Sequence, residues 1–91
     1  MILTVIIPAY NEKNTIKKII QKIKLVKNIK KQIILVDDGS TDGTTDIIKK
    51  KLSSNEDKII FHKRNFGKGA AIISAKKFIK GNYVIIQDAD L

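Results

Sequence analysis

The sequence contains no cysteine. This absence excludes disulfides, thiolate metal ligands and a cysteine nucleophile, and it is typical of a protein in a reducing compartment. No apolar run approaches the roughly 20 residues that a membrane-spanning helix needs. Residues Met1–Pro8 are apolar, but no basic segment precedes them and they are too few for the apolar part of a signal peptide. We therefore expect a cytoplasmic protein that touches a membrane, where it does so, only peripherally at the cytoplasmic face.

Aromatic residues are scarce at 5%, whereas 18 basic residues stand against 9 acidic ones. The resulting net charge of +9 permits binding to nucleic acid, acidic lipid headgroups or phosphorylated small molecules. A nucleic-acid-binding protein would interleave aromatic residues with a basic stripe or carry a recognition motif, and the sequence shows neither. We therefore expect no nucleic-acid partner, and we interpret most of the lysines as solvated helix faces.

Four short apolar segments rich in isoleucine and valine alternate with helical patterns. These segments are Ile2–Pro8, Gln32–Asp38, Lys58–Lys63 and Tyr83–Asp90. Such runs are typical of strands that are buried on both faces of a parallel sheet. Apolar residues spaced by three and four predict helices between them. The predicted helices are Lys13–Lys27, Thr44–Leu52 and Gly67–Ile79. The order β-α-β-α-β-α-β predicts a single α/β domain with right-handed crossovers.

Most of the acidic residues close the predicted strands or follow them. The six that do so are Glu12, Asp37, Asp38, Asp42, Asp88 and Asp90. Because ligands of open parallel sheets bind outside the carboxyl ends of the strands, these side chains should converge at one functional edge. Converging carboxylates repel one another unless a positive group joins them.

The sequence DAD places Asp88 and Asp90 one residue apart. Residues i and i+2 of an extended strand point to the same side, so both carboxylates could face one cation if strand geometry continues through them. Mg²⁺ and Mn²⁺ favour such oxygen ligands. A polar strand end without a ligand is the alternative interpretation. An EF-hand loop is excluded because its glycine and distal glutamate are absent.

The segment VDDGSTDGT, residues 36–44, contains a turn glycine followed by Ser40, Thr41 and Asp42, any of which can cap the next helix. Capping does not explain Asp37 and Asp38, whose carboxylates could accept hydrogen bonds from a nucleobase or a ribose.

The segment PAYNE, residues 8–12, has no glycine, which excludes the dinucleotide fingerprint G-x-G-x-x-G after the first strand. Tyr10 could stack on a base instead. Alternatively, Tyr10 covers the end of the sheet, and Asn11 or Glu12 begins the helix.

The segment RNFGKGAA, residues 64–71, opens the third helix. Its glycines free the backbone, and Lys68 lies near a helix N-terminus, which favours a phosphate site. The Walker A pattern is not matched. A flexible helix start with small residues that pack on the sheet is the alternative.

Taken in order, VIIPAYNE, ILVDDGSTDGT, RNFGKGAA and GNYVIIQDADL resemble the family 2 glycosyltransferases of the GT-A fold. The combination of N-x-G-K-G-A-A with D-A-D-L is most similar to the polyprenyl-phosphate sugar transferases of the dolichyl-phosphate mannose or glucose synthase type. The resemblance implies a Rossmann-like parallel sheet of order 3-2-1-4. It also implies inverting transfer of a sugar from a UDP- or GDP-linked donor, with polyprenyl phosphate at a membrane surface as the acceptor.

The resemblance also implies roles for individual residues. The implied nucleotide-binding residues are Pro8, Ala9, Tyr10, Glu12, Asp37, Asp38 and Lys68. Of these, Asp38 would bind the base with Asp37 beside it, and Lys68 would lie near the nucleotide. Asp88 and Asp90 would hold Mg²⁺ or Mn²⁺ on the donor diphosphate.

Chains of this family are considerably longer than 91 residues. The resemblance therefore implies that residues 1–91 are the N-terminal, donor-binding part of a GT-A domain. We expect the catalytic carboxylate beyond Leu91, and no sugar transfer by the 91 residues alone. A fourth strand left unpaired at the sheet edge would favour a homodimer through that edge. A non-catalytic nucleotide-binding module is the alternative function.

Overall fold

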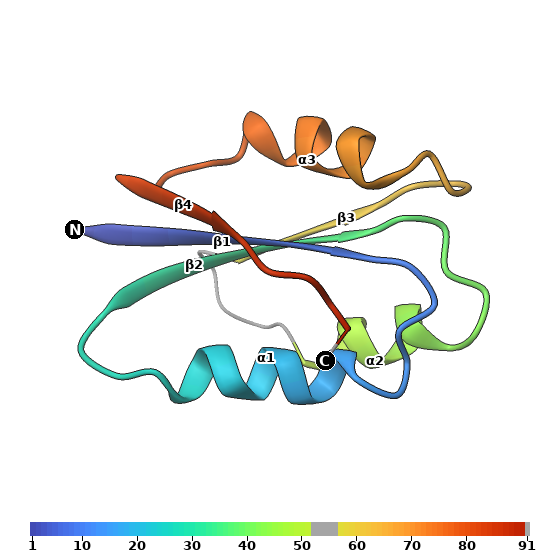
Figure 1. The fold of residues 1–91 in the computed structure, drawn as a ribbon, viewed down its shortest axis with the longest axis horizontal. Coiled ribbons are helices and arrows are strands. Elements are labelled where there is room, and N and C mark those ends of the chain that lie inside the picture. Colours follow the sequence, from blue (N-terminus) through green and yellow to red (C-terminus); the bar gives the residue numbers. More distant parts are fainter. Residues whose placement is uncertain (52–56, 91) are drawn as a thin grey trace.

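The computed structural model describes residues 1–51 and 57–90. The strands are β1 (Ile2–Ala9), β2 (Lys30–Asp37), β3 (Lys58–Phe61) and β4 (Tyr83–Ile86). The helices are α1 (Ile16–Leu25), α2 (Thr44–Lys51) and α3 (Lys68–Lys76). Helices α1 and α2 cover one face of the sheet and α3 covers the other (Figure 1). The predicted alternation of strands and helices is therefore confirmed.

All the strand pairs are parallel, and the strand order is β3-β2-β1-β4. This is the order that the family resemblance implies. Ala9 pairs with Asp37, and Asp37 pairs with Phe61, so the carboxyl ends of three strands are aligned. Because β1 lies between β2 and β4, the residues that follow β1, β2 and β4 meet at the carboxyl end of the sheet.

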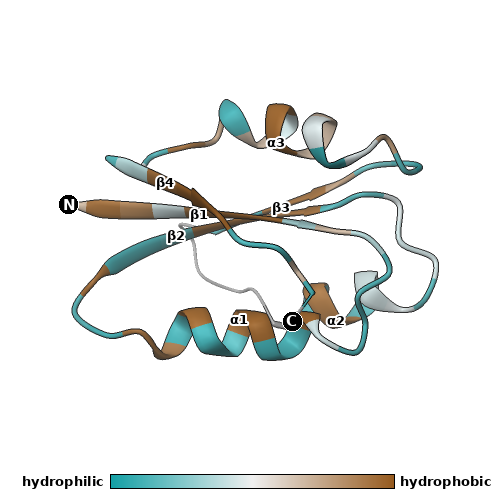
Figure 2. Ribbon diagram, viewed as in Figure 1, coloured by the Kyte–Doolittle hydropathy of each residue, from teal (hydrophilic) through white to brown (hydrophobic). Residues whose placement is uncertain are grey.

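The hydrophobic core has one part on each face of the sheet. Under α1 and α2, the fully buried side chains of Ile7, Ile16 and Ile48 belong to one cluster. Under α3, the strands contribute Ile6, Ile34 and Val36, and the helix contributes Ala71 and Ala75. Figure 2 shows hydrophobic residues concentrated in the central strands and alternating with hydrophilic ones along α1.

The prediction that every strand is buried on both faces is wrong for β3 and β4. No residue of β3 is fully buried, and its end residues Lys58 and Phe61 are exposed. The four residues of β4, Tyr83, Val84, Ile85 and Ile86, are between 43% and 62% exposed. In the described part of the chain, β4 pairs only with β1 and forms an edge of the sheet. The homodimer expected through this edge stays a prediction.

Several element boundaries differ from the predictions. The first helix, for example, spans Ile16–Leu25 and is shorter at both ends than predicted. The fourth strand ends at Ile86 and does not continue to Asp90, because its pairing with β1 stops there. The third helix ends at Lys76 and not at Ile79, and Ile73 in its middle is 67% exposed. Alanines face the sheet on α3 instead. The predicted end of the second helix, Leu52, lies outside the described residues.

A buried polar network fixes the start of β4, at the end of the sheet opposite the carboxyl ends of the strands. The Thr4 hydroxyl donates to Gln32 Oε1 over 2.7 Å and accepts from the Gly81 backbone N–H over 2.9 Å. Gln32 Nε2 donates to the Phe78 carbonyl, and the Lys80 N–H donates to Gln32 Oε1. The network ties the α3–β4 connection to the two central strands.

No helix within residues 1–51 and 57–90 is both long and apolar enough to cross a membrane.

Candidate functional site

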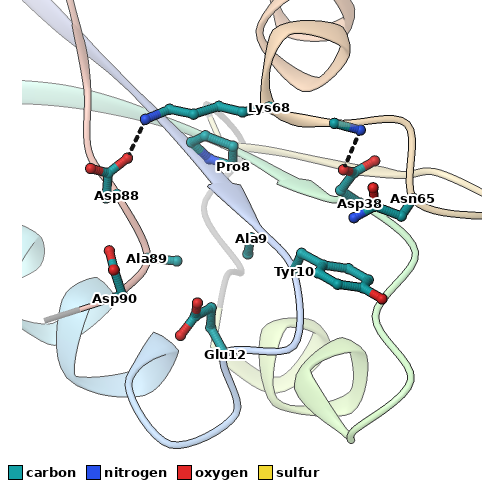
Figure 3. A pocket seen from close by; sticks show the side chains of 11 residues that line it. Pro8, Ala9, Tyr10, Glu12, Asp38, Asn65, Lys68, Asp88, Ala89 and Asp90 are labelled. Atoms are coloured by element: carbon teal, nitrogen blue, oxygen red, sulfur yellow. Dashed lines mark hydrogen bonds and ion pairs between the residues drawn. The ribbon is translucent and has the colours of Figure 1, made fainter.

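A pocket of about 400 Å³ lies at the carboxyl ends of β1, β2 and β4. Its lining residues are Pro8, Ala9, Tyr10, Glu12, Asp38, Asn65, Gly67, Lys68, Asp88, Ala89 and Asp90 (Figure 3). The structure therefore brings together every residue of the predicted site except Asp37. Sequence reasoning did not single out Asn65 or His62 as site residues.

The loops that follow β1 and β2 are tied together by hydrogen bonds from backbone N–H groups. Asn11, in the loop after β1, has a positive φ of 52°. Its N–H donates to Ser40 Oγ over 3.0 Å, and its side-chain oxygen accepts from the Thr41 N–H over 2.7 Å. The Glu12 N–H donates to Thr44 Oγ1 over 2.9 Å. These bonds fix the direction in which the chain leaves β1, and with it the positions of Tyr10 and Glu12.

Asp37 and Asp42 serve the local structure of the β2–α2 loop. Asp37 is 2% exposed, and its carboxylate accepts from the Ser40 N–H and the Thr45 hydroxyl. Asp42 accepts from both the N–H and the hydroxyl of Thr44, the first residue of α2. Of the three predicted capping residues, Asp42 therefore makes the contact at the helix start. Burial raises the pKa of Asp42, but these hydrogen bonds and one from the Lys13 N–H outweigh it, so the pKa lies below its usual value.

Asp38 holds the β3–α3 loop against the end of β2. Its Oδ1 accepts from the Phe66 N–H over 2.9 Å, and its Oδ2 accepts from the Gly67 N–H over 2.9 Å. Burial raises the pKa of Asp38, but the hydrogen bonds from Phe66, His62 and Gly67 outweigh it and the net pKa is lowered. The ionised carboxylate thus positions the loop that leads into Lys68.

His62 connects Asp38 to helix α3. Its Nδ1 lies 2.8 Å from Asp38 Oδ1, and its Nε2 lies 2.8 Å from Ser74 Oγ. Because an ionised carboxylate only accepts hydrogen bonds, Nδ1 must carry the proton. The Phe66 ring packs edge-on against the imidazole, with 5.5 Å between ring centroids. His62 therefore supports the wall of the pocket from behind.

Gly39 allows the two loops around Asp38 to touch. It has a positive φ of 77°, and a Cβ atom there would lie 2.4 Å from the carbonyl carbon of Arg64. It would also lie 2.6 Å from the Asn65 nitrogen. The β3–α3 loop could not approach β2 this closely if residue 39 had a side chain.

The segment after β4 forms the opposite wall of the pocket. The Thr15 hydroxyl donates to the Ala89 carbonyl over 2.6 Å, which ties this segment to the start of α1. Ala89 is 4% exposed and packs in the core, while Asp88 and Asp90 on either side of it are exposed. Lys68 Nζ lies 2.5 Å from Asp88 Oδ1, so an ion pair joins the two walls (Figure 3).

Asp88, Asp90 and Glu12 are the pocket carboxylates that a cation could approach. Among the described residues, no group of three or more acidic or imidazole side chains is arranged to hold a metal ion. The residues therefore do not fit an all-protein metal cage. They do fit Mg²⁺, which is usually held by one or two carboxylates and takes its other oxygen ligands from phosphates and water.

The comparisons with known proteins agree on the family. The model of the family described as "Glycosyl transferase family 2" matches residues 4–91. The undecaprenyl-phosphate 4-deoxy-4-formamido-L-arabinose transferase of Aeromonas hydrophila is 34% identical over 99% of this chain and 29% of its own length. This chain thus spans less than a third of that relative.

Two solved structures share the fold closely. The Pyrobaculum calidifontis mannosyltransferase PcManGT, in complex with GDP-Man and Mn²⁺, has a TM-score of 0.88 and 29% identity over 97% of this chain and 27% of its own. S. aureus TarS 1-349, in complex with UDP-GlcNAc, has a TM-score of 0.88 and 28% identity over 99% of this chain and 27% of its own. These neighbours are GT-A glycosyltransferases, which confirms the predicted fold. With its four motifs, its strand order and the family match in agreement, the chain belongs to glycosyl transferase family 2.

Proposed function

We propose that residues 1–91 form the donor-binding part of a metal-dependent, inverting glycosyltransferase. The observation that carries this proposal is the pocket at the carboxyl ends of β1, β2 and β4, where Tyr10, Lys68 and the two acids of the DAD sequence meet. An aromatic ring, an ammonium group and a carboxylate pair match the base, the diphosphate and the cation of a nucleotide-sugar complex.

Within this pocket, Tyr10 would stack on the base, with Pro8 and Ala9 shaping the wall beneath it. Asp38 already accepts bonds from the chain, but a carboxylate has about four acceptor sites, so it could also accept from the base. Asp37 would support Asp38 from the last position of β2.

Lys68 would neutralise part of the charge of the diphosphate, and Glu12 would line the nucleotide pocket. Asp88 and Asp90 would hold Mg²⁺ or Mn²⁺. When bound, the cation neutralises the charge that develops on the leaving nucleoside diphosphate. Inverting transfer requires the acceptor to attack the anomeric carbon from the face opposite this diphosphate.

Polyprenyl phosphate is the proposed acceptor, reached by peripheral contact with the cytoplasmic membrane face. The relative from Aeromonas hydrophila, named for undecaprenyl phosphate, supports this acceptor class. UDP and GDP remain alternative nucleotides, because the two complexes described above hold UDP-GlcNAc and GDP-Man. Since this chain spans 29% of that relative, we further propose that residues 1–91 bind donor without transferring sugar on their own.

Amide NMR spectra of the 91-residue protein, recorded with UDP or GDP and Mg²⁺, test the proposal. We expect the signals of Tyr10, Asp38 and Asp90 to shift, to depend on Mg²⁺ and to shift less in Asp88→Asn. The matched control is Asp46→Asn, which removes the same charge from an exposed position on α2. A well-dispersed wild-type spectrum that neither nucleotide moves would contradict the proposal. Nucleotide shifts that are indifferent to Mg²⁺ would favour a non-catalytic nucleotide-binding module.

A further inference from the structure

Lys68 and Asp88 form the ion pair that bridges the pocket. Lys68 is the first residue of α3, and Asp88 lies in the segment after β4. Figure 3 shows the extended Lys68 side chain reaching from one wall to the other. The Lys68 side chain is 56% exposed and the Asp88 side chain is 60% exposed. Water therefore competes for both charged groups, and the ion pair is weak. The two side chains can therefore exchange partners at a small cost in free energy.

The surroundings of the pair show which partners would compete for it. Asp90 and Glu12 line the same pocket and add negative charge on the side of Asp88. Lys68 lies on the other side at a helix N-terminus, where the backbone N–H groups also favour an anion. A divalent cation is thus attracted to Asp88, and a diphosphate is attracted to Lys68. Neither can take its position fully while the two side chains hold each other.

We propose that Lys68 is an exchangeable counter-ion, which occupies Asp88 until a divalent cation and a nucleoside diphosphate bind together. The cation then takes Asp88, and the released ammonium group moves to the diphosphate. The four-carbon side chain of lysine allows this movement without displacement of the helix. This inference rests on the proposed function and adds to it an order of affinities: the cation alone binds weakly, and the cation with the nucleotide binds tightly.

If Lys68 exchanges partners in this way, removal of its charge should strengthen the binding of the cation alone and weaken the binding of the nucleotide. In Lys68→Gln, the cation no longer competes with an ammonium group, so Mn²⁺ alone should bind more tightly. The diphosphate loses its lysine partner, so UDP or GDP should bind more weakly at saturating Mn²⁺. Because coupling between two ligands is reciprocal, the factor by which nucleotide tightens Mn²⁺ binding should also fall. A lysine that served only the nucleotide would leave the affinity for Mn²⁺ alone unchanged.

The test is a titration of the 91-residue protein with Mn²⁺, in which the electron paramagnetic resonance signal reports free Mn²⁺. Without nucleotide, we expect Lys68→Gln to bind Mn²⁺ about twofold to fivefold more tightly than wild type, the range for an exposed ion pair. Lys68→Arg keeps the charge and should resemble wild type. Lys76→Gln, at the other end of α3, makes the same change in net charge and should leave the affinity close to that of wild type.

Three outcomes separate this inference from the proposed function. Tighter Mn²⁺ binding together with weaker nucleotide binding in Lys68→Gln supports both. A second outcome is that the wild type binds Mn²⁺ and nucleotide, but Lys68→Gln binds Mn²⁺ alone no more tightly than the wild type does. This outcome overturns the exchange and leaves the proposed function intact. A folded wild type that binds neither Mn²⁺ nor UDP nor GDP overturns both.

Discussion

The substitution Gly39→Ala adds a single methyl group and should test how the pocket is held together. The Gly39 φ of 77° is a conformation that residues with a side chain rarely adopt. The atoms that a Cβ would meet, at 2.4 and 2.6 Å, belong to the backbone of Arg64 and Asn65. A backbone cannot rotate out of the way as the end of a long side chain can, so the whole β3–α3 loop would have to move.

The cost of Gly39→Ala follows from these two effects. Left-handed backbone geometry costs a residue with a side chain about 1–2 kcal/mol. Forcing packed neighbours apart typically adds about 1–3 kcal/mol. We therefore expect the free energy of unfolding to fall by roughly 2–5 kcal/mol. The displaced loop carries the N–H groups of Phe66 and Gly67, which bind Asp38, so nucleotide binding should weaken as well.

Urea denaturation followed by circular dichroism measures this loss, and Gly43→Ala provides the control. Gly43 also has a positive φ, of 102°, but no atom beyond its own chain neighbours lies within 4 Å of the position of its Cβ. The control variant therefore reports backbone strain without the collision. In NMR spectra, the amide signals of Phe66 and Gly67 should move in Gly39→Ala and stay in place in Gly43→Ala. The reasoning is refuted if Gly39→Ala is no less stable than the control and leaves both signals unmoved.

Two further predictions concern buried polar contacts. The lowered pKa of Asp38 means that its contribution to stability is present above the unfolded value of about 3.9 and is lost as the pH falls through the folded value. Urea unfolding at several pH values below about 5 should therefore show a shallower pH dependence in Asp38→Asn than in wild type, and equal slopes would contradict this. Thr4→Val removes the donor to Gln32 and the acceptor for the Gly81 N–H, which should cost about 1–3 kcal/mol in urea unfolding. Thr4→Ser keeps the hydroxyl as a control, and a loss as large as that of Thr4→Val would show that the methyl group matters instead.

The alternation of strands and helices could be predicted from the sequence because local patterns determine it. The end of β4 could not, because it depends on a partner that is remote in sequence. Ile6 pairs with Ile86, and the Gln87 N–H makes the last bond to β1, at the Ile6 carbonyl. Beyond that point the chain no longer pairs with β1, although β1 itself continues to Ala9, so the alternation of side chains assumed for Asp88 and Asp90 does not apply.

The helix face of α3 illustrates a second limit. Both alanines and isoleucines recur along Lys68–Lys76, so the spacing alone allowed more than one buried face. The sheet accepts Ala71 and Ala75, which are fully buried, and leaves Ile73 exposed. Small residues allow this helix to lie close over β1 and β2, a steric requirement that hydrophobicity does not reveal. His62 was missed for a related reason, since its partners Asp38 and Ser74 lie 24 and 12 residues away.

The acids at the functional edge show most clearly what the structure adds to the pattern. In the sequence, Asp37, Asp38 and Asp88 all lie at the ends of predicted strands, and nothing local distinguishes their roles. Asp37 is buried and accepts hydrogen bonds from Ser40 and Thr45, and Asp38 is buried and holds the next loop through backbone N–H groups. Asp88 is 60% exposed and paired to a lysine that water can reach. A buried carboxylate that already accepts hydrogen bonds from the chain is costly to turn toward a cation, because those bonds must first break, whereas an exposed ion pair exchanges readily. Cation chemistry at this pocket should therefore depend on Asp88 far more than on Asp37, although the two residues look alike in sequence.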